Sequence, residues 1–155
     1  MALLTTLVVR RFKSYVDPSG DPEDIQSIPR YVREGYGLSG VNLEASLLAG
    51  MSVSKIDQLR DVSDKAGCPC LILMQHDPLK INHESPKEAD QSIERLVRLT
   101  IAGGRLGCNS IAIGIASPSS EDHVFYIVDR FRKVMPRIER SDLNILLMPQ
   151  ENGLT

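Results

Sequence analysis

Five short apolar runs alternate with four helix-like stretches along the chain. The apolar runs cover residues 3–9, 38–45, 68–75, 108–116 and 143–148. The first run has apolar residues at both odd and even positions, which is typical of a strand covered on both faces. Strands that recur every ~30–40 residues with a helix between them indicate parallel strands joined by helical crossovers. The pattern therefore predicts an α/β protein.

The helix-like stretches carry recognisable start and stop residues. Asp21 is expected to cap the first helix, which Pro29 should kink or shorten. Ser52 is expected to cap the second helix, and Ser85-Pro86-Lys87-Glu88 has the form of a capping box with proline at the first helical position. The expected helices occupy residues 21–37, 52–67, 85–107 and 117–138.

The regular alternation of strand and helix predicts part of a (β/α)8 TIM barrel. A complete barrel takes about 250 residues and eight strands, whereas this chain has 155 residues and five expected strands. We therefore expect one domain over residues 1–155, the N-terminal half of such a barrel, with parallel strands in the sequential order 1-2-3-4-5. Two copies that close one barrel and an open, doubly wound sheet of order 2-1-3-4-5 are the alternatives. Open sheet edges would favour self-association.

Composition narrows the class of protein. The net charge of −2 does not indicate a nucleic-acid-binding surface. Met1–Val9 lacks the basic start of a signal peptide, and no apolar run reaches the ~18–20 residues of a membrane span. Cys68, Cys70 and Cys108 are expected to be buried thiols rather than zinc ligands. A cytoplasmic protein is the expectation.

Four segments carry a resemblance to a known family. They are Gly-Val-Asn-Leu-Glu at 40–44, Leu-Ala-Gly-Met-Ser at 48–52, Leu-Arg-Asp at 59–61, and the end of the chain at 143–155. Together they resemble the xylose isomerase-like TIM barrel superfamily, which includes sugar phosphate isomerases and epimerases and endonuclease IV-type enzymes. The resemblance implies a small carbohydrate as substrate and a 1,2-proton or hydride movement as reaction.

The same resemblance implies a divalent metal, Mn²⁺, Mg²⁺ or Zn²⁺, at the C-terminal mouth of the complete barrel. His76 matches a histidine ligand that follows strand three in endonuclease IV-type members, and Glu151 offers the carboxylate that closes strand five in the family. Glu151 comes two residues late, because a gapless match places Pro149 at the ligand position. The metal is therefore expected of the full-length protein more than of this chain.

Polar side chains near the expected strand ends are the candidate substrate ligands. Asn42 and Glu44 alternate with apolar neighbours and therefore point to one face, which is either the barrel interior or an exposed strand end. Lys80 could meet a phosphate at the mouth or remain a solvated charge. His76 and Asp77 are expected just beyond the end of strand three, where His76 could shuttle a proton or merely cap the loop.

The sequence thus predicts a sugar phosphate isomerase- or epimerase-like protein that is inactive as these 155 residues alone. One alternative is a non-catalytic relative that binds a sugar or a partner protein. Another is an endonuclease IV-like, metal-dependent phosphodiesterase. This last alternative is disfavoured because residues 115–117 offer no histidine at the end of strand four.

Overall fold

The computed structural model describes residues 4–10, 25–116 and 122–149, and in this part five strands form one sheet in chain order. All four neighbouring pairs are parallel. This is the order of a partial α/β TIM barrel, as predicted, and it excludes the open sheet of order 2-1-3-4-5. The strands are β1 (Leu7–Val9), β2 (Val41–Glu44), β3 (Cys70–Leu79), β4 (Ser110–Ile115) and β5 (Asn144–Leu147).

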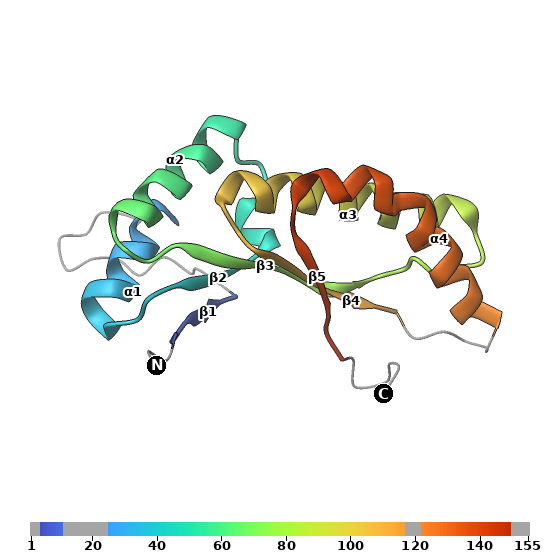
Figure 1. Cartoon of the computed structure of the whole chain (residues 1–155), viewed down its shortest axis with the longest axis horizontal. Helices are drawn as coiled ribbons and strands as arrows, with labels where there is room; N and C mark the ends of the chain where they lie inside the picture. Colours follow the sequence, from blue (N-terminus) through green and yellow to red (C-terminus); the bar gives the residue numbers. More distant parts are fainter. Residues whose placement is uncertain (1–3, 11–24, 117–121, 150–155) are drawn as a thin grey trace.

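The four α-helices lie on one face of the sheet, and the opposite face carries no helix among the described residues (Figure 1). Leu43, Leu73 and Ile111 sit side by side on β2, β3 and β4, and each is at most 1% exposed beneath the helices. The core therefore lies between the sheet and its helices. These are α1 (Ile28–Tyr36), α2 (Val53–Lys65), α3 (Pro86–Leu106) and α4 (Asp122–Ile138), with short 3-10 turns at Ile25–Ser27, Ala45–Leu48 and Glu139–Ser141.

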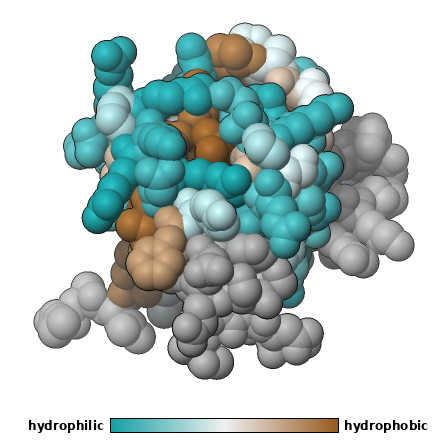
Figure 2. Space-filling view, turned by 90° about the vertical axis from the view of Figure 1, so that its right-hand side faces the viewer, coloured by the Kyte–Doolittle hydropathy of each residue, from teal (hydrophilic) through white to brown (hydrophobic). Residues whose placement is uncertain are grey.

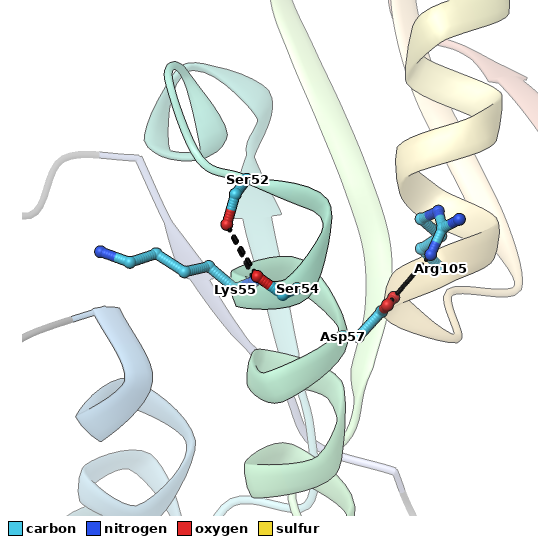
Figure 3. A network of polar contacts seen from close by, with 5 residues as sticks. All are labelled: Ser52, Ser54, Lys55, Asp57 and Arg105. Carbon is cyan, nitrogen blue, oxygen red and sulfur yellow. Dashed lines mark hydrogen bonds and ion pairs between the residues drawn. The ribbon is translucent and has the colours of Figure 1, made fainter.

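The starts of the first two α-helices follow from their sequences. Helix α1 begins at Ile28 with Pro29 in its first turn, so the proline shortens the expected helix instead of kinking it. The expected cap, Asp21, lies outside the described residues. At α2 the prediction is confirmed, because the Ser52 hydroxyl accepts a hydrogen bond from the Lys55 backbone nitrogen at 3.3 Å (Figure 3).

The start of α3 has the predicted position and a different mechanism. Ser85 is the residue before the helix, but its side chain makes no capping hydrogen bond. The Ser85 backbone N–H donates instead to Nδ1 of His83 at 3.1 Å, and Glu88 pairs with Lys80. The predicted capping box is therefore wrong, because a neighbouring imidazole already occupies the donor that Glu88 would have satisfied.

Glycines in α3 let this helix lie close to the sheet. A Cβ atom on Gly103 would overlap the side chain of Ile111 on β4. Gly107 ends the helix with a φ of +77°, the left-handed conformation that glycine adopts without strain. On the same helix Arg105 forms an ion pair with Asp57 of α2 at 3.0 Å, which joins the two neighbouring helices (Figure 3).

The three cysteines are free thiols and all are buried, as predicted. Figure 2 shows one side of the molecule, which is largely hydrophilic with small, separate hydrophobic areas. None of the helices within residues 4–10, 25–116 and 122–149 has the length and apolar character of a membrane span.

Candidate functional site

The last residues of β2 place two polar side chains on the face of the sheet that lacks helices. Asn42 and Glu44 alternate with Val41 and Leu43, and Leu43 belongs to the helix-covered core. Asn42 and Glu44 therefore share the opposite face, as predicted from their spacing. Each is only 7% exposed, so these polar groups are buried and need partners.

Asn42 uses only part of its hydrogen-bonding capacity. Its Nδ2 donates to the hydroxyl of Thr6, just before β1, at 3.2 Å. Its Oδ1 is buried, and no described residue donates to it. The amide is thus oriented by Thr6 and leaves one acceptor without a partner among the described residues.

Glu44 shows the same division between its two oxygens. Oε1 accepts a hydrogen bond from the backbone nitrogen of His76 at 3.1 Å, whereas Oε2 is buried with no donor among the described residues. A buried carboxylate oxygen without a donor costs about 1–3 kcal/mol or more of stability. Such an acceptor in a native structure calls for a further partner, which a bound ligand can supply.

The segment that supplies this backbone nitrogen is an irregular part of β3. The strand was expected to end at residue 75, with His76 and Asp77 beyond it, but it runs to Leu79 and includes both residues. That expectation was wrong because the pairing with β4 is interrupted after Gln75 and resumes at Leu79, opposite Ile115. Residues 76–78 therefore form a bulge within the strand, and the His76 side chain is exposed there.

The sequence prediction missed the side chains that hold this bulge from the helix side. Gln75 Oε1 accepts hydrogen bonds from Nε and Nη2 of Arg95 on α3, at 3.1 and 2.9 Å. Gln75 Nε2 donates to the carbonyl of Asp77 at 3.2 Å. The only indication in the sequence was a polar residue at the end of an apolar run, which does not identify a partner on a helix 20 residues later.

The structure brings Asn42, Glu44 and His76 together at neighbouring strand ends and does not join Lys80 to them. The Lys80 Nζ pairs with Glu88 of α3 at 3.4 Å, and the lysine backbone nitrogen donates to Ser92 on the same helix. No hydrogen bond or ion pair of the described residues links Lys80 to the other three. Glu151 lies outside the described residues.

The described side chains at this site offer few ligands for a metal ion. Glu44 and His76 offer one free carboxylate oxygen and one imidazole on adjacent strands. A catalytic zinc site has three protein ligands, and the described residues contain no group of three or more histidines, cysteines or acids that could hold a metal. The described side chains therefore do not fit a metal centre by themselves.

Comparison with known proteins yields similarities of structure. No protein-family model matches the chain, and no curated protein matches it in sequence. Among solved structures, the chain is similar to 3-keto-D-glucoside 4-epimerase YcjR from E. coli, with 18% identity, a TM-score of 0.70 and coverage of 95% of this chain and 57% of that one.

Two other structures give the same picture. D-psicose 3-epimerase from Clostridium cellulolyticum, solved with D-tagatose, is 12% identical with a TM-score of 0.72, over 91% of this chain and 51% of that one. A xylose isomerase domain protein from Planctomyces limnophilus is 13% identical with a TM-score of 0.66, over 96% and 55%. At these identities the similarity shows the fold, and the chain spans about half the length of each structure.

Proposed function

We propose that this chain, which has the fold of the xylose isomerase-like TIM barrels over about half their length, carries part of the substrate site of a carbohydrate isomerase or epimerase. Fold alone does not fix an activity. The proposal therefore depends on the chemistry of the face that carries Asn42 and Glu44. The structural similarity to two sugar epimerases supports the choice of ligand class.

The observation that carries the proposal is the pair of buried acceptors, Asn42 Oδ1 and Glu44 Oε2. Both need hydrogen-bond donors, and sugar hydroxyls are donors. Side chains two residues apart on a strand are about 6.6 Å apart along it, so the two oxygens suit different hydroxyls of one sugar. The hydrogen bonds to the Thr6 hydroxyl and to the His76 backbone N–H orient both side chains before a ligand binds.

The described residues suggest a division of tasks in the reaction. Asn42 and Glu44 bind and orient hydroxyl groups, and Thr6 holds the amide of Asn42. His76, whose backbone N–H donates to Glu44 Oε1, is exposed, and its side chain is the candidate proton donor or acceptor of this set. The described residues do not supply a set of metal ligands. Turnover is expected of a complete barrel, in which further strand ends contribute catalytic groups.

Binding of D-tagatose, the sugar present in one of the similar structures, tests the proposal. Titration followed by NMR or calorimetry should show binding to the 155-residue chain. Asn42→Leu and Glu44→Gln should each weaken it about tenfold, because each removes an acceptor for a hydroxyl. Glu34→Gln removes the same charge from the exposed face of α1 and should leave binding unchanged.

Activity is measured in the same samples. ¹³C NMR of labelled D-tagatose should show no conversion to another sugar by the 155-residue chain. Absence of binding by the unaltered chain, or equal binding by Glu44→Gln, would contradict the sugar-site proposal. Conversion of D-tagatose by the 155-residue chain would instead contradict the expectation that further strand ends are needed for catalysis.

We also propose that the 155-residue chain associates through its sheet edges. β1 and β5 are the edge strands of the described sheet. Leu147 on β5 is 64% exposed although its pairing partner Ile113 is fully buried, and Val8 on β1 is 45% exposed. Apolar edge strands favour pairing with another chain.

A further inference from the structure

We propose that Gln75 and Arg95 are positioning residues for the candidate sugar site, acting through the bulge at residues 76–78. They lie on the helix side of the sheet, away from the face that carries Asn42 and Glu44. Their effect on a ligand would be transmitted through hydrogen bonds to the backbone of β3. This inference rests on the proposed function for its sugar-binding consequence, although its structural part can be tested without a ligand.

The bulge is the element that these residues hold. Gln75 pairs with Ile113 and Leu79 with Ile115, so residues 76, 77 and 78 oppose the single residue Gly114. Pro78 has no N–H and therefore gives up no ladder hydrogen bond by lying in the irregular segment. Bulges beside functional sites commonly serve to redirect a side chain or a backbone group.

A chain of three groups connects α3 to this bulge. The guanidinium of Arg95 donates twice to Gln75 Oε1, at 3.1 and 2.9 Å, which fixes the plane of the amide. The other end of the same amide donates to the Asp77 carbonyl at 3.2 Å. Gln75 is only 7% exposed, so water does not readily replace these partners.

On the other face, the bulge determines the orientation of a ligand-binding group. The His76 N–H, two peptide units before the Asp77 carbonyl, donates to Glu44 Oε1 at 3.1 Å. This bond leaves Oε2 as the acceptor without a donor among the described residues. If the Asp77 carbonyl loses its hydrogen bond from Gln75, the direction of the His76 N–H is no longer fixed. The Glu44 carboxylate then loses the hydrogen bond that orients it.

The decisive variant is Gln75→Glu, which separates positioning from simple stability. A carboxylate at residue 75 still accepts both bonds from Arg95 but has no donor for the Asp77 carbonyl. We expect the midpoint of unfolding to stay close to that of the unaltered chain. Exchange of the His76 amide hydrogen, measured by NMR, should become about tenfold faster, and affinity for D-tagatose should fall about tenfold.

Two substitutions on α3 complete the experiment. Arg95→Gln removes the forked donor and should give the same changes in exchange and affinity together with lower stability. Arg98→Gln removes an equal charge from an exposed position of the same helix and should change neither the exchange of the His76 amide hydrogen nor the affinity for D-tagatose. If Gln75→Glu does not fold, Arg95→Lys takes its place, because a single ammonium cannot fix the amide plane and should give faster His76 exchange.

The outcomes distinguish the two proposals. Unchanged His76 exchange in both Gln75→Glu and Arg95→Gln would overturn the positioning role. Faster exchange with unchanged D-tagatose affinity would overturn it as well, because the bulge would then not affect the ligand. If the unaltered chain does not bind D-tagatose, the proposed function fails, and the exchange measurement alone decides whether these residues hold the bulge.

Discussion

Asn42 and Glu44 are polar residues that are buried in the sheet. Each of them forms one hydrogen bond to another segment of the chain and keeps one buried oxygen without a donor among the described residues. The spacing of these residues was enough to predict their common face. Their partners could not be predicted, because the Thr6 hydroxyl and the His76 N–H come from segments distant in sequence.

The buried thiols should make the stability of the fold depend on pH in the alkaline range. Burial raises the pKa of Cys70 from 9.0 to about 11 and that of Cys108 from 9.0 to about 12. Above pH 9 the unfolded chain loses these protons while the folded chain retains them, so unfolding becomes more favourable. The stability present below pH 9 should fall by about 1.4 kcal/mol per pH unit per thiol as the pH rises toward 11.

Urea unfolding in the presence of a reductant at pH 8, 9 and 10 measures this effect. A Cys70→Ala/Cys108→Ala variant will be less stable at pH 8, because it loses buried volume, but its stability should depend less on pH. If the free energy of unfolding falls equally with pH in both proteins, the thiols do not cause the loss of stability at alkaline pH.

At the scale of elements, local sequence predicted the bounds of α2 and α3 closely, whereas α1 begins later than expected and α3 is capped differently. Ser52 caps α2 as expected, whereas the α3 start uses His83 in place of the predicted capping box. The bulge in β3 was not predicted, because it lies in the pairing of β3 with β4, two strands that are distant in sequence. Contacts between elements decide such features, and the local pattern does not contain them.

Two adjacent glycines of α3 should respond in opposite ways to alanine. Gly103→Ala would place a methyl group against Ile111 and should lower the free energy of unfolding by about 1–3 kcal/mol. Gly104→Ala meets no atom within 4 Å and should raise it by up to about 1 kcal/mol, because alanine is the better helix former. Thermal or urea unfolding of both variants provides the comparison. Equal effects would mean that α3 does not approach β4 as closely as described.

For the molecule as a whole, the alternation of strand and helix predicted the parallel sheet, and the observed sequential order is the one favoured over the open order 2-1-3-4-5. The number of strands follows from the recurring apolar runs, and consecutive strands usually lie side by side in a sheet. The candidate site was predicted only in part, because its assembly depends on how several strand ends meet. Asn42, Glu44 and His76 meet there, whereas Lys80 turns to α3.

The exposed edge of β5 should lead the chain to self-associate. The 155-residue chain should show a sedimentation coefficient that rises with concentration, and Leu147→Lys should shift it toward the monomer, because a charged edge opposes strand pairing. Phe125→Lys is a matched control, since Phe125 is 75% exposed on α4 and not on an edge strand. A concentration-independent monomer, or an equal response of both variants, would rule out association through β5.

The length of the β3 bulge has a consequence for how this part of the chain can vary. Three residues face one on β4, so two are extra, and an even number keeps the alternation of the strand in phase. Leu79, which is 5% exposed, therefore returns to the helix-covered side together with Gln75. Removing two residues from 76–78 would leave the hydrophobic interior in frame while erasing the loop that presents His76. Removing one would turn Leu79 outward, so the length of the segment can change only in steps of two residues.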